Sequence, residues 1–283
     1  MRVRILGSAA GGGIPQWNCA CAGCAAARRS GAHRTQDGVA VTGDGTAWYL
    51  VNASPDLRVQ LVSAGDLDPG PGRRDTPIRG VLLTTAELDH TAGLLGLREA
   101  GRLDLTATAT VLAALPLIPI LRRYTDLRTH ELPIGAPLAL DGGLTVRALV
   151  VGAKVPRYAD PCPDHRPDDA WVTALRIGDE RTGRSFVYAT CLPAWTDAFD
   201  AFLAGADAAL LDGTFSTEDE PARAAGLTRT PREMGHLPIA GALPALRRHP
   251  GVRFLFGHLN NTNPYAAGPA PVEVARDGQE LLL

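Results

Sequence analysis

Residues 82–99 read LLTTAELDHTAGLLGLRE, and this stretch joins a strand pattern to a helix pattern. The apolar run GVLLT is typical of a buried strand, and TAGLLGLREAG has apolar residues at helical spacing with a glycine as a stop. Asp89 and His90 stand between the two. Two interpretations of this pair stay open: Asp89 caps the helix and His90 is a polar residue of its first turn, or both are ligands gathered at a strand end.

The same alternation of strands and helices extends along the whole chain. Short β-rich or apolar runs bounded by Gly, Pro or Asp are RVRILG, VAVT, AWYLVNA, GVLLT, LTVRALVV, WVTALRIG, SFVYAT, AALLD and VRFLFG. Amphipathic helices are expected in SPDLRVQLVSAG, with Ser54 as its cap, and in PAWTDAFDAFLAGA and LPIAGALPALRRHP. Residues 66–78 and 152–170 are rich in Pro, Gly and Asp and are expected to be loops. The pattern predicts an α/β layered fold, with residues 1–283 in a single domain.

The composition limits the class of protein. The chain has 283 residues, of which 45% are hydrophobic and 20% charged, and its formal net charge is −2. It is long enough to bury a substantial core, and the lack of a basic excess argues against a nucleic-acid partner. No signal-peptide pattern is seen, and no apolar run reaches the roughly 20 residues that span a bilayer. We therefore expect a cytoplasmic protein with no membrane partner.

Three of the five cysteines stand close together in IPQWNCACAGC, as Cys19, Cys21 and Cys24. Three thiolates at this spacing can converge on one Zn²⁺ ion, which favours four sulfur or nitrogen ligands. We interpret the segment at about 17–28 as a structural zinc clip, with a fourth ligand from a distant part of the chain. Two alternatives stay open: close packing of small residues in an Ala-rich loop, and a redox pair formed by Cys21 and Cys24.

Further chemically active side chains stand at the ends of later elements. Asp212 is the last residue of the run AALLD. His236 precedes a helix pattern in REMGHLPI, and His258 follows a strand pattern in RFLFGHLNNTNP. Packing alone would not place Asp and His repeatedly at such ends, so these residues favour the ligand interpretation of Asp89 and His90. The remaining histidines, in polar loop or surface contexts, are expected to have no such role: His33, His130, His165 and His249.

Several segments together carry a family resemblance. They are NCACAGC, NASPDLR, AELDHTAGLLGLRE, KVPRY, MGHLPI and HLNNTNP, in this order, and the match extends from residue 2 to about 265. In these segments the chain resembles the pyrroloquinoline quinone biosynthesis protein B family, which belongs to the metallo-β-lactamase fold superfamily. The resemblance implies a four-layer αβ/βα sandwich, in which two mixed sheets pack face to face and helices cover the outside.

The superfamily's ligand motif is only partly present. H-x-H-x-D-H falls on Thr85, Glu87, Asp89 and His90. Lys154 stands where the next histidine is expected, and the metal-bridging Asp, expected around Thr190 or Cys191, is absent. The final histidine matches His258. A two-zinc hydrolase site therefore cannot be assembled in the usual way.

One carboxylate and two imidazoles remain: Asp89, His90 and His258. This donor set is that of a mononuclear non-haem Fe(II) site with open positions for O₂ and substrate. The resemblance also implies oxygen chemistry. It implies an iron-dependent oxygenase that hydroxylates the tyrosine-derived ring of a cross-linked Glu–Tyr precursor, with O₂ as co-substrate. Ring oxygenation needs a redox-active metal, and zinc is redox-inert. Two other functions stay open: a non-catalytic carrier of the quinone or its precursor, involved in its transport, and a metal-dependent hydrolase.

The remaining candidates surround this expected site. We expect Asp212 to be a fourth ligand or an acceptor that orients His258 or His90. His236 is expected to act as general acid or base or to orient bound oxygen. The carboxylate of Glu87 is expected to approach the metal or to bind the ammonium group of the substrate.

Two further groups of residues complete the predicted site. Lys154, Arg157 and Tyr158 of KVPRY are candidates for binding the carboxylates of the substrate. Asn261 is a candidate fourth zinc ligand, although an amide is a poorer zinc ligand than an imidazole. The expected partner is the small amino-acid-derived precursor, and a homodimer is the assembly considered.

Overall fold

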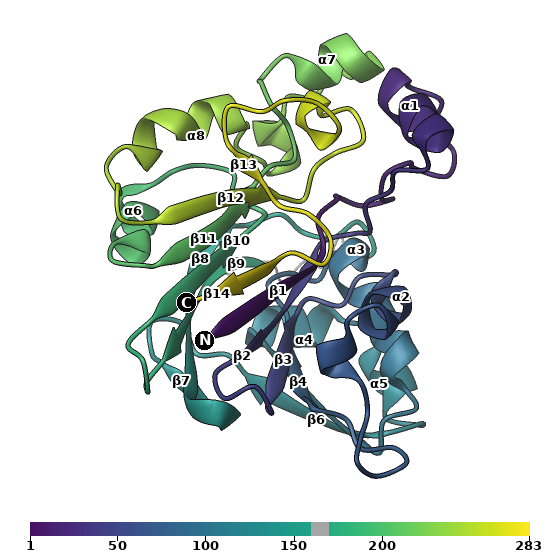
Figure 1. Cartoon of the computed structure of the whole chain (residues 1–283), viewed down its shortest axis with the longest axis vertical. Coiled ribbons are helices and arrows are strands. Elements are labelled where there is room, and N and C mark those ends of the chain that lie inside the picture. Colours follow the sequence, from purple (N-terminus) through teal and green to yellow (C-terminus); the bar gives the residue numbers. More distant parts are fainter. Residues whose placement is uncertain (160–169) are drawn as a thin grey trace.

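The computed structural model describes residues 1–159 and 170–283, so the predicted loop 152–170 falls partly outside the described residues, as does His165. Figure 1 shows two facing sheets with helices on their outer sides, and each sheet has seven strands. In spatial order the first sheet consists of β14 (Glu280–Leu282), β1 (Arg2–Gly7), β2 (Gly38–Thr42), β3 (Trp48–Val51), β4 (Ile78–Leu82), β5 (Arg102–Ala107) and β6 (Asp126–Glu131). The second consists of β13 (Glu273–Val274), β12 (Arg253–Gly257), β11 (Ala208–Asp212), β10 (Ser185–Ala189), β9 (Val172–Asp179), β8 (Leu144–Gly152) and β7 (Leu138–Leu140).

Both sheets are mixed, and they repeat the same arrangement. In the first sheet the pairs from β14 to β3 are antiparallel and those from β3 to β6 are parallel. In the second sheet the pairs from β7 to β10 are antiparallel and those from β10 to β13 are parallel. The predicted sandwich of two mixed sheets is confirmed.

The helices form the two outer layers. Their bounds are α1 (Ala22–Ser30), α2 (Leu57–Val62), α3 (Leu88–Thr91), α4 (Ala109–Ala114), α5 (Ile118–Leu121), α6 (Asp197–Leu203), α7 (Glu220–Ala225) and α8 (Ile239–Leu246). Short 3₁₀ helices are η1 (Gly65–Leu67), η2 (Ala92–Leu97), η3 (Asp141–Gly143), η4 (Arg232–Met234) and η5 (Pro264–Ala266). Helices α2, α4 and α5 pack on the first sheet, whereas α6 and α8 pack on the second (Figure 1).

The central strands are buried on both faces, which explains their continuous apolar sequences. In β11, Ala208 and Leu210 point to the core between the sheets, and Ala209 and Leu211 point to the core under α6 and α8. The run AALLD therefore needs no polar alternation. The same reasoning holds for β10 and β12, and it is the reason why these strands could be predicted.

The predicted helices differ in how well they agree with the structure. Helices α6 and α8 lie within their predicted ranges. The prediction that Ser54 caps α2 is wrong: Asp56 holds the cap position without a side-chain cap, and the Ser54 hydroxyl bonds the Gln60 side chain at 3.1 Å. The helix predicted after His90 begins at Leu88, before the predicted range, and continues only as η2.

Tertiary hydrogen bonds interrupt the helix after His90. The Ala53 N–H donates to the His90 carbonyl at 2.7 Å, and the Gly93 N–H donates to the Ala53 carbonyl at 2.9 Å. Groups that would extend the α-helical ladder are thus bonded to the segment after β3. A Cβ atom on Gly93 would lie 2.0 Å from the Ser54 carbonyl oxygen, so only glycine allows this approach. The contact fixes the backbone of His90.

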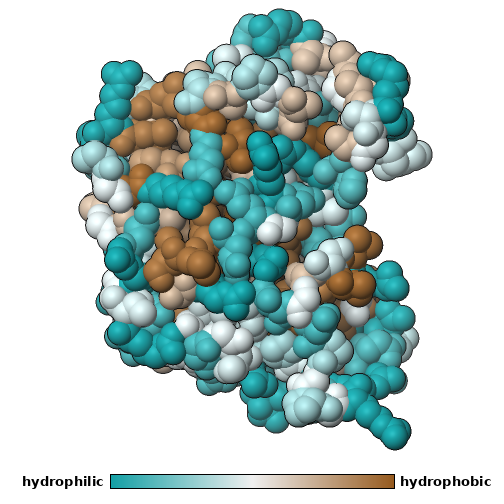
Figure 2. All heavy atoms as spheres, viewed as in Figure 1, coloured by the Kyte–Doolittle hydropathy of each residue, from teal (hydrophilic) through white to brown (hydrophobic). Residues whose placement is uncertain are grey.

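The surface shows how the apolar residues are distributed. Figure 2 shows hydrophilic side chains over most of the viewed face, with apolar residues in separate patches, one of them over the region of α6 and α8. Across residues 1–159 and 170–283, we find no helix with the length and apolar character of a membrane span.

The close approach of Gly93 can be tested by mutation. Gly93→Ala should lower the free energy of unfolding by about 1–3 kcal/mol, because the added methyl group meets a backbone carbonyl. Gly96→Ala, in the same 3₁₀ helix, is the matched control, because no atom lies within 4 Å of its added methyl group. Urea titration measures both proteins. Equal losses of stability in the two variants would contradict the explanation.

Candidate metal centres

The candidate residues meet at one edge of the sandwich, where the strands of both sheets end. Asp89 and His90 lie in α3, after β4 of the first sheet. Asp212 ends β11, and His258 follows β12, both in the second sheet. The backbone of His258 has φ of 55°, a left-handed conformation that is uncommon outside glycine and that costs of order 1–3 kcal/mol. The chain therefore bends sharply at the residue that carries this imidazole.

The two sheets are joined at the site by Asp89 and His258. Asp89 Oδ2 lies 3.3 Å from His258 Nε2, and the rings of His90 and His258 are 5.2 Å apart between centroids. Burial opposes ionisation of Asp89, but His90 and His258 outweigh it and hold the pKa of Asp89 well below its usual range. Burial also acts to lower the pKa of His258, but the hydrogen bond and charge of Asp89 raise it. A bound metal ion would take the place of the proton on Nε2.

His90 provides an independent sign that a cation belongs here. Its side chain is 1% exposed, and neither ring nitrogen has a hydrogen-bond partner in the described part of the chain. A buried polar group without a partner costs about 1–3 kcal/mol. A metal ion bound by an imidazole nitrogen would remove that cost. The interpretation of Asp89 as a helix cap is wrong, because Glu87 holds the cap position of α3.

Thr214 connects the ligand His258 to Asp212 and His236. Its hydroxyl donates to Asp212 Oδ1 at 2.7 Å, so its oxygen can accept from His258 Nδ1 at 2.9 Å. This fixes the tautomer of His258 and leaves Nε2 free to face Asp89. Asp212 Oδ2 is bonded to the Leu192 N–H at 2.8 Å and to His236 Nδ1 at 2.8 Å.

The role of Asp212 follows from these bonds. Asp212, His236 and His258 lie close enough together to hold an ion, but both carboxylate oxygens of Asp212 are already engaged. This geometry favours the orienting role over that of a fourth ligand. In the same way, the bond from His236 Nδ1 leaves Nε2 as the nitrogen available to a substrate.

A second carboxylate lies behind His90. Asp37 is 1% exposed, and its Oδ2 is 3.6 Å from His90 Nε2. The same oxygen accepts hydrogen bonds from the Tyr188 hydroxyl and, at 2.6 Å, from Thr190 Oγ1. An acidic group so placed can orient the imidazole. An Asp-Gly pair before a strand is an ordinary turn signal, so Asp37 gave no functional signal in the sequence.

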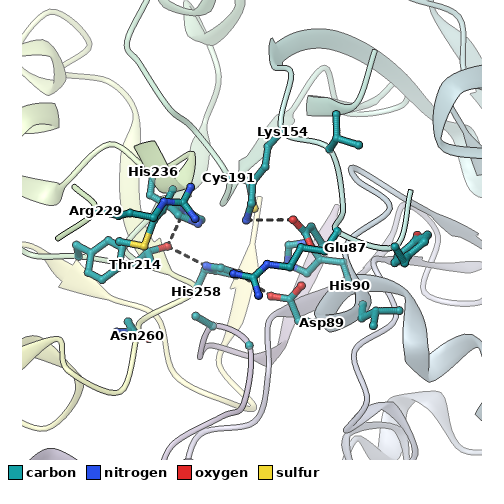
Figure 3. Close-up of a pocket in the computed structure, with 18 residues that line it drawn as sticks. Glu87, Asp89, His90, Lys154, Cys191, Thr214, Arg229, His236, His258 and Asn260 are labelled. Atoms are coloured by element: carbon teal, nitrogen blue, oxygen red, sulfur yellow. Dashed lines mark hydrogen bonds and ion pairs between the residues drawn. The ribbon is translucent and has the colours of Figure 1, made fainter. Parts of the chain in front are cut away.

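Glu87 and Lys154, which align with expected metal-ligand positions of the superfamily's motif, form an ion pair. Glu87 stands at a ligand position of the H-x-H motif, and its Oε1 lies 3.1 Å from Lys154 Nζ (Figure 3). Burial acts to lower the pKa of Lys154, but the charge of Glu87 outweighs it and raises the pKa above its usual value. Thr85 is buried, and its hydroxyl accepts from the Glu87 N–H at 3.3 Å. A protein ammonium group therefore supplies the positive charge at this position.

A cavity of about 600 Å³ opens beside the candidate ligands, and the three candidate substrate-binding residues Lys154, Arg157 and Tyr158 line it. Arg157 makes no hydrogen bond or ion pair with any other described residue, so its guanidinium is available to a ligand. The Tyr158 hydroxyl donates to the Ala86 carbonyl at 2.5 Å, and burial, with a smaller contribution from Glu87, raises the pKa of Tyr158 to about 12. Tyr158 thus holds its loop against the segment after β4.

Among the lining residues that the sequence does not single out for the cavity are Arg229, Met234 and Asn260. Arg229 precedes η4 and Met234 is the last residue of η4, in a stretch where the sequence singles out only His236. Asn260 stands two residues after His258, beside the zinc-ligand candidate Asn261, and its sequence context gives no sign of a role in the cavity. Thr214 also escaped prediction, because a threonine after a strand carries no distinctive signal.

The three clustered cysteines lie together at the N-terminal end of α1, which Cys21 caps and which contains Cys24. The sulfur atoms of Cys19, Cys21 and Cys24 lie within 4.8 Å of one another. Asn261 Nδ2 lies 3.0 Å from Cys19 Sγ, 3.4 Å from Cys24 Sγ and 3.6 Å from Cys21 Sγ. Rotation of this amide by half a turn would direct its oxygen at the same point. The arrangement suits a zinc clip with Asn261 at the fourth position.

The two centres can be separated by mutation. Asp89→Asn should remove the metal of the Asp89–His90–His258 site and leave the clip zinc, because it neutralises one donor of that site alone. Cys24→Ser should remove the clip zinc, because Cys24 is one of its three sulfur donors. Metal content per chain, measured by mass spectrometry, checks both variants. Loss of both metals in either variant would contradict two independent centres.

The hydrogen bonds of Thr214 give a second test. Thr214→Val keeps the shape but removes the hydroxyl that fixes His258, so affinity for the active-site metal should fall roughly 10–100-fold. Competition with a chromogenic chelator measures the affinity. Thr182→Val, in the exposed turn between β9 and β10, is the control. An unchanged affinity in Thr214→Val would show that Thr214 does not position the ligand.

Known proteins resemble this chain over its whole length. Residues 47–259 match the family described as the β-lactamase superfamily domain. The coenzyme PQQ synthesis protein B of Cupriavidus necator is 43% identical and aligned over 99% of both chains, and that of Azoarcus sp. strain BH72 is 40% identical over 100% of both.

Solved structures agree with this assignment. Zinc-bound PqqB from Methylobacterium extorquens has a TM-score of 0.90 and 34% identity over 100% of both chains. A diphosphatase of the PhnP family has a TM-score of 0.72 at 19% identity, a likeness that shows the fold alone. The chain belongs to the metallo-β-lactamase superfamily and, within it, to the family of coenzyme PQQ synthesis protein B.

Proposed function

We propose that this chain hydroxylates the tyrosine-derived ring of a cross-linked Glu–Tyr precursor in the synthesis of PQQ. Asp89, His90 and His258 would hold Fe(II), and O₂ would be the co-substrate. Membership of the PQQ synthesis protein B family supports the pathway. The donor set supports the chemistry, since a carboxylate and two imidazoles are typical of non-haem Fe(II) oxygenases. Bound iron would supply redox activity that zinc lacks.

The ion pair between Glu87 and Lys154 is the observation that carries this proposal. In two-metal hydrolysis the paired ions stabilise both the attacking and the leaving oxygen, and here the ammonium group of Lys154 holds a positive charge at that position without offering a coordination site. What remains is a single metal position beside a cavity. A single ion with open positions suits oxygenation better than two-metal hydrolysis.

The surrounding side chains support binding and proton transfer. His236 is held by Asp212 through Nδ1, and Nε2 is the nitrogen that can take or give the proton of a phenol. Arg157 and Arg229 line the cavity and suit the carboxylates of the precursor. If the ammonium group of a substrate displaced Lys154 from Glu87, Lys154 would become a third cationic group available to the substrate's carboxylates. Tyr158 would contribute its ring surface, because its hydroxyl is bonded to Ala86.

A carrier of the quinone or its precursor is the second candidate function. The same cationic side chains favour it, because an acidic quinone could be held by Arg157 and Arg229 without a metal. Quinone binding that survives Asp89→Asn, with no product formed by the native chain, would support the carrier. In both functions the partner is a small molecule, with no nucleic acid or membrane involved. Cytoplasmic location and a homodimer stay predictions.

Oxygen uptake tests the proposal. Insertion of one oxygen atom of O₂ into the ring C–H bond takes two electrons and two protons, which convert the other oxygen atom into water, so the reaction needs an external reductant. Protein purified without oxygen is loaded with an equimolar amount of Fe(II), and O₂ consumption is recorded with the tyrosine-derived precursor and an excess of ascorbate as the electron donor. We expect O₂-dependent hydroxylation with iron and none with zinc, because the chemistry needs a redox-active metal. Asp89→Asn should lose both the iron and the turnover.

The control is Asp68→Asn, which removes an exposed carboxylate outside the cavity and should keep both iron and turnover. Iron-loaded native protein that consumes no O₂ with the precursor would overturn the proposal. Hydrolysis of phosphodiesters by the zinc-loaded chain in the absence of oxygen would instead support the hydrolase.

A further inference from the structure

We propose that the thiol of Cys191 is a fourth protein ligand of the metal held by Asp89, His90 and His258. Cys191 follows β10, in the region where the superfamily's bridging Asp is expected and absent. The inference rests on the metal site of the proposed function and adds a donor of a different chemical kind. It changes the ligand set from one carboxylate and two imidazoles to one that also contains a thiolate.

The positions of the donor atoms carry the inference. The ligand atoms of His90, Cys191 and His258 all lie within 4.8 Å of one another. In a tetrahedral site with bonds of about 2.0–2.3 Å, donor atoms lie roughly 3.3–3.8 Å apart. Small side-chain rotations would therefore bring the three atoms onto one ion. Asp89 Oδ2, 3.3 Å from His258 Nε2, is already at that spacing.

His90 supplies a second, independent observation. Both its ring nitrogens are buried without a partner, and they belong to the same cluster of donor atoms as the sulfur. Cys191 also lacks a hydrogen-bond partner among the described residues, and it lines the cavity (Figure 3). The thiol and the imidazole both lack hydrogen-bond partners, and their donor atoms lie within a few ångströms of each other. One bound ion would give both groups a partner.

The charges around Cys191 indicate when the thiolate forms. Burial, Asp212 and Asp89 raise the pKa of Cys191 well above its usual value, with Lys154 acting in the opposite direction. On metal binding, the S–H bond breaks, its proton leaves to solvent and a sulfur–metal bond forms, with no change in oxidation state.

A thiolate ligand has a chemical consequence. Together with the Asp89 carboxylate it balances the charge of a divalent ion, and as a soft donor it favours softer metals than a carboxylate does. Thiolate donation also stabilises the oxidised state of a redox metal. The site would therefore differ in metal preference from one built on Asp89, His90 and His258 alone.

Cobalt binding tests the inference without an activity assay. Cys162, outside the described residues, is replaced by serine in every protein compared, and the clip is filled with zinc beforehand. Co(II) is then added to the parent and to Cys191→Ser in the absence of oxygen. The absorption spectrum of the variant is subtracted from that of the parent, so that any absorption from cobalt bound at the cysteine clip cancels. We expect this difference spectrum to show a sulfur-to-cobalt charge-transfer band in the near ultraviolet. Affinity for Co(II) should fall roughly tenfold or more in the variant.

Two further variants complete the design. Cys191→Ala excludes coordination by the serine oxygen, and its thermal unfolding shows whether the fold is kept. Asp89→Asn should weaken cobalt binding but retain the sulfur band at saturating cobalt, because the thiol is intact. Superimposable spectra and equal affinities in the parent and both Cys191 variants would overturn the inference. That result would leave oxygen uptake by iron-loaded protein unaffected, whereas a sulfur band without oxygen uptake would overturn only the proposed function.

Discussion

The contact between Asp89 and His258 is the interaction on which the site depends. Asp89 is fixed to the first sheet through α3, and His258 is fixed to the second through β12, yet their side chains meet at 3.3 Å. The candidate ligands Asp89, His90 and His258 come from both sheets, so the apolar packing between the inner faces is a condition for bringing them together. Leaving either charge buried without its partner would cost several kcal/mol, which a metal ion or the partner must offset.

Much of the fold could be predicted because its central strands are buried on both faces and are therefore continuously apolar. β5 and β6 were missed because RLDLTA and DLRTHE carry charges, and much of β6 is exposed at the edge of its sheet. The length of the helix after His90 could not be predicted, since hydrogen bonds from Ala53, distant in sequence, end it.

At the site, Asp and His at strand ends are conspicuous in any sequence, and they could be singled out. Thr214 and Asp37 could not, because a hydroxyl or a turn carboxylate acquires meaning only from its distance to an imidazole. The Lys154–Glu87 ion pair could be predicted from the sequence only in part. The absent histidines were visible in the sequence, but the salt bridge in their place required the fold. A covalently attached cation differs from a second metal in one respect: it cannot dissociate, so this position keeps its charge at any metal concentration.

The left-handed backbone of His258 sets local stability against function. At φ of 55° glycine is unstrained, whereas histidine, like other residues that carry a Cβ atom, bears a steric cost. Replacement of His258 by glycine would remove the backbone strain and stabilise the loop after β12, but it would also remove the imidazole from the site. Substitutions that stabilise the loop therefore weaken metal binding. We expect the histidine to be retained only as long as its role as a ligand is under selection.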